Sequence, residues 1–140
     1  MTAAAAQLRA AQLRYQADAV MSAPPERLLT MLYDRLLLDV ERAQAAQETG
    51  DFGGANAQLQ HAQAIVAELT SSLTDAWDGS AGLRSVYAYL TRTLIEANVA
   101  RDPERTRACR DVIAPLRDAW HAAAASVAAP APTAAMAAHA

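Results

Sequence analysis

Histidine and cysteine are the side chains of this sequence best suited to acid–base, nucleophilic or metal chemistry. A di-iron site in a helical bundle needs two Glu-x-x-His motifs, and the nearest match is Asp118-x-x-His121 at the end of a helical pattern. His61 lies among glutamines, which favours a solvated histidine over a catalytic one. Cys109 lies on an apolar stripe, which favours an inert buried thiol over a nucleophile. Five glycines in turns form no phosphate-binding loop. We therefore expect no enzyme activity, no metal and no other cofactor.

Composition and charge reduce the number of possible functions and partners further. The 140 residues fit one domain, and only five Gly and six Pro favour a mainly helical chain. The net charge is -3 and no basic patch emerges, so we expect no nucleic acid partner. A single cysteine forms no intrachain disulfide, which is compatible with a reducing cytoplasm. We find neither a signal-peptide layout nor a run of 18 apolar residues, so we expect a cytoplasmic protein without direct membrane insertion.

Four helices of about 20 residues must position any site. The apolar periodicity and turn residues place them at about residues 24–48, 54–76, 81–101 and 103–121. Asp51, Ser80 and Asp102 are the expected capping residues, and Pro115 predicts a kink in the last helix. Short connections predict an all-α, antiparallel up-down-up-down four-helix bundle. We assign residues 22–124 to it, residues 1–21 to a mobile N-terminal arm and residues 125–140 to a disordered Ala/Pro-rich tail.

Two of the helices carry more apolar residues than one buried face uses. The first has a core stripe at Leu29, Leu32, Tyr33, Leu36 and Val40. Met31 and Leu38 lie on its opposite side, and the third helix has a second stripe at Ala88, Ile95 and Val99. In the second helix, only Ile65 departs from a single apolar face. The first and third helices of such a bundle lie diagonally, so a partner that contacts both surplus stripes has to wrap around it.

The pattern alone does not decide what covers these stripes. Two or three exposed apolar residues on a helix are normal on any protein surface, and a homo-oligomer would also bury them. Heterologous partner binding is the third interpretation.

Several short motifs, taken in order, are more specific. They are Tyr15-Gln16, Pro25-Glu26-Arg27-Leu28 with Met31-Leu32-Tyr33-Asp34, Leu94-Ile95-Glu96-Ala97-Asn98 with Asp102-Pro103-Glu104, and Leu116-Arg117-Asp118-Ala119-Trp120. Together, over about residues 13 to 121, the sequence resembles the FliS family, the flagellar secretion chaperones of flagellin.

The resemblance implies a cytoplasmic export chaperone. Such a protein binds the disordered C-terminal segment of flagellin, prevents premature polymerisation and delivers flagellin to the flagellar type III export apparatus. The expected flagellin-binding residues combine the surplus stripes with two further positions: Tyr15, Leu28, Met31, Leu38, Ala88, Ile95 and Val99. The alternative is a homo-oligomeric helical adaptor with no flagellin role, and whether the free chain forms a homodimer stays open.

The N-terminal arm is more apolar than a disordered end requires. It contains Leu13, Tyr15, Val20 and Met21. We expect it to dock near a surplus stripe with Tyr15 as its anchor, because a tethered segment is present at a high effective concentration. A frayed terminus is the alternative.

Overall fold

The computed structural model describes residues 3–4, 7, 25–74 and 78–128, and the helices that pack together lie within the last two ranges. They are α2 (Pro25–Glu48), α3 (Phe52–Ser71), α4 (Ser80–Ala100) and α5 (Pro103–Ala128). No strand is present within the described residues. The prediction of an all-α chain is confirmed.

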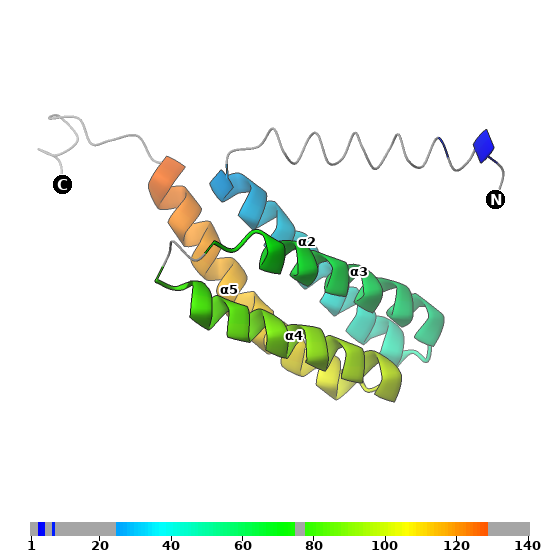
Figure 1. The fold of residues 1–140 in the computed structure, drawn as a ribbon. Helices are drawn as coiled ribbons and strands as arrows, with labels where there is room; N and C mark the ends of the chain where they lie inside the picture. The colour runs from blue at the N-terminus through cyan, green and yellow to red at the C-terminus, as the bar shows by residue number, and fades with distance from the viewer. Residues whose placement is uncertain (1–2, 5–6, 8–24, 75–77, 129–140) are drawn as a thin grey trace, which may run out of the picture.

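The helices form an antiparallel four-helix bundle (Figure 1). α2 packs against α3 and α5, and α4 packs against the same two helices. α2 and α4 therefore occupy diagonally opposite corners, as the up-down-up-down topology predicts. The outer faces of these two helices point to different sides of the molecule.

Two of the three expected capping residues act as predicted. The side chain of Asp51 accepts a hydrogen bond from the Gly54 N–H at 2.9 Å, at the start of α3. Asp102 accepts one from the Glu104 N–H at 3.0 Å, at the start of α5. Each bond satisfies a helical N–H that has no partner within its own helix, which stabilises the helix by about 1 kcal/mol.

Ser80 is not a capping residue. It is the first residue of α4, and Gly79 occupies the capping position without a side-chain hydrogen bond. Ser80 is buried, and its hydroxyl donates to the carbonyl of Thr74. The expectation was wrong because this hydroxyl satisfies a carbonyl of the preceding connection instead of an N–H of α4.

Two helix boundaries also differ from the prediction. α3 ends at Ser71 and not near residue 76, and the hydroxyls of Ser71 and Ser72 donate to carbonyls of its last turn. α5 continues through Pro115 to Ala128 and includes the first four residues assigned to the tail. Alanine favours helix, so the alanine-rich sequence extends α5 although it lacks an apolar stripe. Residues 129–140 lie outside the described part.

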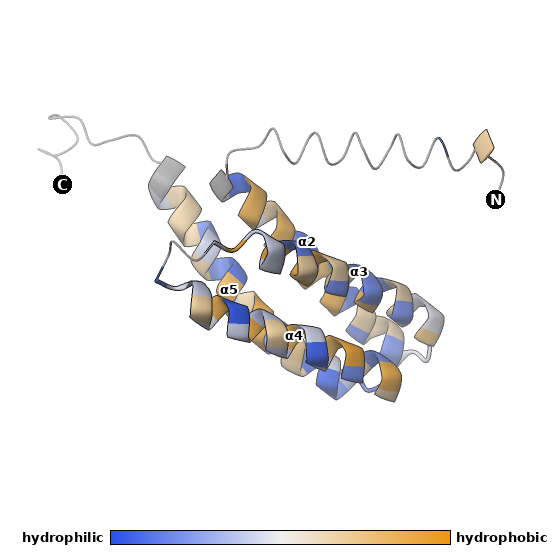
Figure 2. Cartoon of the chain, viewed as in Figure 1, coloured by the Kyte–Doolittle hydropathy of each residue, from blue (hydrophilic) through white to orange (hydrophobic). Residues whose placement is uncertain are grey.

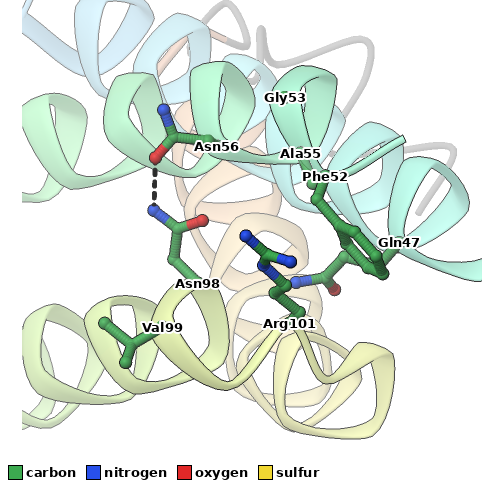
Figure 3. Close-up of a pocket in the computed structure, with 8 residues that line it drawn as sticks. All are labelled: Gln47, Phe52, Gly53, Ala55, Asn56, Asn98, Val99 and Arg101. Carbon is green, nitrogen blue, oxygen red and sulfur yellow. Dashed lines mark hydrogen bonds between the residues drawn. The ribbon is translucent and has the colours of Figure 1, made fainter. Parts of the chain in front are cut away.

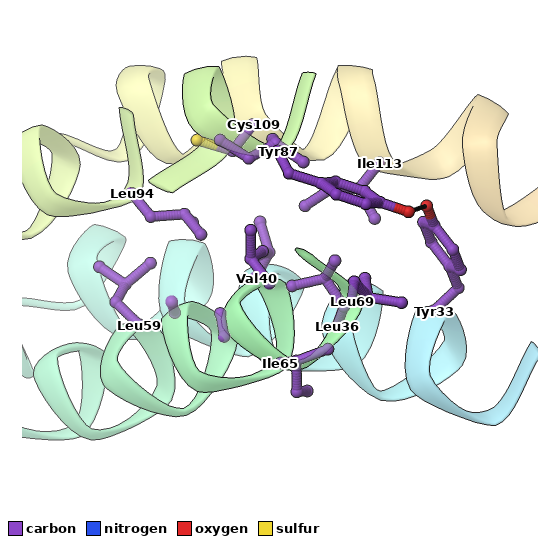
Figure 4. Close-up of a cluster of buried hydrophobic side chains, with 14 residues drawn as sticks. Tyr33, Leu36, Val40, Leu59, Ile65, Leu69, Tyr87, Leu94, Cys109 and Ile113 are labelled. Carbon is purple, nitrogen blue, oxygen red and sulfur yellow. Dashed lines mark hydrogen bonds between the residues drawn. The ribbon is translucent and has the colours of Figure 1, made fainter. Parts of the chain in front are cut away.

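All four helices contribute to the core (Figure 4). Its largest fully buried apolar side chains are Tyr33, Tyr87, Leu36, Val40, Leu59, Val66, Leu69, Leu90, Leu94 and Ile113. Ile65 is also buried, because α3 packs against both α2 and α4 and needs a wider apolar face than one seam. The sequence interpretation of Ile65 as an outlier was therefore wrong.

Polar groups join the helices inside the bundle. The hydroxyls of Tyr33 and Tyr87 lie 2.5 Å apart, and Trp120 stacks on Tyr33 at 6.3 Å between ring centroids. Burial raises the pKa of both tyrosines. At the opposite end of α2, the amide of Gln47 donates to the Ala97 carbonyl at 3.1 Å and accepts from the Thr106 hydroxyl at 2.6 Å. Gln47 therefore connects α2 with both α4 and α5.

None of the described helices combines the length and the apolar character that crossing a membrane requires.

Candidate functional site

The outer face of α2 exposes large apolar side chains. Met31 is 43% exposed and Leu38 is 38% exposed, whereas Leu36 in the same helix is completely buried. At 100° per residue, positions seven apart fall on the same side of a helix, so Met31 and Leu38 share one face. Arg35 and Arg42 are also exposed. The core of the bundle is therefore closed without these two apolar residues.

The outer face of α4 is apolar in the same way. Ile95 is 45% exposed, Val99 is 80% exposed, and Ala88 is exposed as well. Figure 2 shows apolar residues in orange along α2 and α4, interspersed with polar residues in blue. The exposure predicted for both surplus stripes is confirmed.

A groove runs beside the α4 stripe. Ala88 and Ile95 line a cavity of about 610 Å³, and Thr70 of α3 forms part of its other wall. Arg84, Arg92 and Glu96 supply its charged lining. An apolar groove with charged edges fits an amphipathic segment that presents one apolar face.

A second cavity of about 420 Å³ lies where the end of α4 meets the start of α3 (Figure 3). Val99 lines it, and the side-chain amide of Asn98 donates to Asn56 across the helices at 2.7 Å. The guanidinium of Arg101 lies over the ring of Phe52, with its carbon 5.0 Å from the ring centroid. Sequence reasoning did not assign Phe52, Asn56 or Arg101 to a site, because their contacts join segments far apart in the chain.

Three further residues complete the comparison with the predicted surface. Leu28 is half-buried near the start of α2. Tyr15, the expected anchor of the arm, lies outside the described residues.

Tyr89 is 38% exposed on α4, and the guanidinium carbon of Arg92 lies 5.9 Å from the centroid of its ring. Sequence reasoning did not identify this exposed aromatic side chain. The spacing of Tyr89 from the α4 core residues would have indicated its exposure.

The cysteine is placed as the sequence predicts. Cys109 is fully buried in the core, and burial raises the pKa of its thiol to about 12. The reactive thiolate is therefore scarce at neutral pH.

His61 is not simply solvated. Its side chain is half-exposed, but its Nδ1 pairs with the fully buried carboxylate of Asp39, which also accepts from Arg35 Nε at 2.9 Å. A buried carboxylate needs such partners. The sequence pattern did not indicate this pair, because Asp39 and His61 belong to different helices.

The Asp118-x-x-His121 pair does not form a site. Instead, His121 Nε2 lies 2.7 Å from Asp34 Oδ1, and Arg117 Nε donates to the same oxygen at 2.8 Å. Burial alone would raise the pKa of Asp34, but the hydrogen bonds with His121 and Arg117 outweigh it and lower this pKa. Within the described ranges, no group of three or more histidine, cysteine, aspartate or glutamate residues is arranged to hold a metal.

Comparison with known proteins gives one consistent result. The family model described as flagellar protein FliS matches residues 6–127. The flagellar secretion chaperone FliS of Bacillus subtilis is 33% identical over 106 residues, which cover 76% of this chain and 80% of that protein. The protein of the same name from Salmonella typhimurium is 29% identical and covers 74% of this chain and 78% of its own length.

A structural comparison supports the same fold. A crystal structure of a bacterial flagellar chaperone superposes with a TM-score of 0.66 at 20% identity. The match covers 82% of this chain and 95% of the other. Because the family model spans most of the sequence, including α2, α3, α4 and all but the last residue of α5, the chain belongs to the FliS family of flagellar proteins.

Proposed function

We propose that this protein is a cytoplasmic export chaperone for flagellin. In this role it binds the disordered C-terminal segment of flagellin, prevents premature polymerisation and delivers flagellin to the flagellar type III export apparatus. Family membership and the names of the relatives support the chaperone role. The observation that carries the binding proposal is the exposure of apolar side chains on two separate faces of a bundle whose core is already closed.

The two faces fit one partner that folds as it binds. Amphipathic helices of the flagellin segment place apolar side chains against Met31 and Leu38 on α2, and against Ala88, Ile95 and Val99 on α4. Ordering a disordered segment costs free energy, which limits the affinity and keeps the complex reversible enough for export. Binding of this kind needs no catalytic group and no cofactor.

Aspartate substitutions on the outer faces test this proposal. Met31→Asp and Ile95→Asp place a charge in the contact, so each should weaken binding to a flagellin from the same genome about 30-fold, equivalent to ~2 kcal/mol. Calorimetric titration gives the affinity, and size-exclusion chromatography of the co-expressed proteins should show a one-to-one complex. Leu36→Asp is the matched core substitution and should unfold the bundle.

Two results would contradict the proposal. If Met31→Asp and Ile95→Asp lowered the melting temperature as much as Leu36→Asp, these residues would be part of the core. If they dissociated only a homodimer and left flagellin binding intact, the homo-oligomeric adaptor would be the better interpretation.

A further inference from the structure

The cavity between the end of α4 and the start of α3 has one charged side chain in its lining, that of Arg101. The remaining walls are side-chain amides, small residues, Phe52 and Val99. The amide of Gln47 forms one wall; its nitrogen donates to the Ala97 carbonyl and its oxygen accepts from the Thr106 hydroxyl. These two hydrogen bonds fix the wall to the core of the bundle. The cavity therefore has one wall fixed by the core and a single cationic group, the Arg101 guanidinium, in its lining.

The backbone of Arg101 is unusual. Its φ of 53° places it in the left-handed region, where it ends α4 with hydrogen bonds from its own N–H to Asn98 and from the Asp102 N–H to Ala97. Glycine is the residue that best suits this position, because a side chain crowds the backbone there. Glycine would therefore adopt this backbone conformation with less strain than arginine does.

The guanidinium of Arg101 contacts an aromatic ring rather than a carboxylate. It lies over Phe52 at 5.0 Å, and Figure 3 shows it between Phe52 and Asn98. Among the described residues, the structure records no ion pair for Arg101. A guanidinium above a ring face is attracted by the ring and can still donate its N–H groups to an acceptor.

We propose that this cavity binds a carboxylate of the protein segment that lies along the outer face of α4, with Arg101 as its hydrogen-bond donor. Charge complementarity selects an anion, and the planar guanidinium matches the two oxygens of a carboxylate. Val99 joins the cavity to the apolar stripe, so one segment reaches both. The carboxylate is that of an acidic side chain or of the chain terminus. This inference rests on the proposed function for the identity of the segment.

Such a contact would set the register of the bound segment. Apolar contacts along α4 tolerate sliding, because similar side chains replace one another, whereas a charged group has one favourable position. Arg101 would therefore determine which part of the partner lies against Ile95 and Ala88.

Substituting Arg101 separates its role in binding from its role in the fold. Arg101→Gly should leave the melting temperature equal or higher, because glycine suits the left-handed position. The same variant should bind the C-terminal segment of flagellin about tenfold more weakly, because a charge-assisted hydrogen bond is lost. Arg101→Gln should weaken binding similarly, whereas Arg107→Gln, with the same charge change at an exposed position of α5, should have little effect.

Two modified flagellin segments identify the source of the carboxylate. One carries an amidated C-terminus, and in the other the acidic side chains are replaced by amides. The segment that lacks the relevant carboxylate should bind wild type about tenfold more weakly and be insensitive to Arg101→Gln. If wild type binds both segments like the unmodified one, or if Arg101→Gly leaves the affinity unchanged, the inference is wrong.

A test without flagellin keeps this inference separate from the proposed function. Three capped peptides serve as probes: acetyl-Leu-Ala-Leu with a free carboxyl, its C-terminal amide, and acetyl-Leu-Ala-Leu-Glu amide. In nuclear magnetic resonance titrations, at least one acidic peptide should shift the backbone signals of Phe52, Asn98 and Arg101, and the neutral peptide should do so at least about tenfold more weakly. Equal shifts from all three would overturn the carboxylate site, even if flagellin binds. If flagellin does not bind but the acidic peptides still shift these signals more strongly than the neutral peptide, only the proposed function is overturned.

Discussion

Gln47 shows how a single buried amide fixes one end of the bundle. Its two ends bond to Ala97 of α4 and to Thr106 of α5, and the residue is 5% exposed. Gln47→Ala should lower the free energy of unfolding by about 1–3 kcal/mol, because the Ala97 carbonyl and the Thr106 hydroxyl each lose one hydrogen bond inside the bundle. Urea unfolding followed by circular dichroism gives this value.

Gln44→Ala is the matched control for this residue. Gln44 lies on the same helix and bonds to Glu48 at the surface, so its substitution should cost less than about 0.5 kcal/mol. Equal effects of the two substitutions would mean that the Gln47 hydrogen bonds add nothing to stability.

At the scale of the elements, a polar cluster joins α2 to the later part of α5. Asp34 accepts from Arg117 and pairs with His121, and these contacts lower its pKa below the ordinary value of 3.8. A carboxylate with a lowered pKa in the folded state stabilises the protein above the unfolded-state pKa, and this contribution is lost as the pH falls through the folded-state pKa.

Asp34→Asn should therefore make the melting temperature less sensitive to acid. Wild type should lose more stability than this variant between about pH 5 and about pH 3, by a small amount because the cluster is exposed. Thermal unfolding of both proteins at the two pH values measures the difference. Glu41→Gln is the control, since Glu41 and Arg110 of α5 are 3.8 Å apart; a larger effect there would contradict the role assigned to Asp34.

The helices and their exposed stripes could be predicted from the sequence because both depend on local spacing. Capping by Asp51 and Asp102, and the exposure of Met31 and Ile95, follow from residue type and from 100° per residue. The burial of Ile65 could not be predicted in this way, because it depends on how many neighbours pack against α3.

The cavity between the end of α4 and the start of α3 also could not be predicted from the sequence. It depends on the left-handed backbone of Arg101 and on contacts with Phe52 and Asn56, which belong to another helix. No periodicity encodes such a contact, and an arginine after a helix is ordinary in a sequence. The family resemblance, in contrast, could be read from short motifs, and the family model confirms it.

For the whole molecule, the diagonal placement of α2 and α4 predicts how substitutions on the two helices combine in a double variant. Met31 and Ile95 lie on different sides, so their aspartate variants should act independently if one flagellin segment contacts both. The double variant should show the sum of the two changes in binding free energy, within about 0.5 kcal/mol. Calorimetric titration of the four proteins tests this sum, and a double variant no weaker than either single one would contradict a partner that spans both faces.

The diagonal placement of α2 and α4 also affects how a bound segment dissociates. A segment held on two sides of the bundle can detach from one side while the other still holds it, so the full binding free energy need not be overcome at once. Pulling on one end of the segment would peel it away in stages, each with a smaller barrier than a single dissociation. An apparatus that pulls on one end of the bound segment could then remove it from the bundle with a small force.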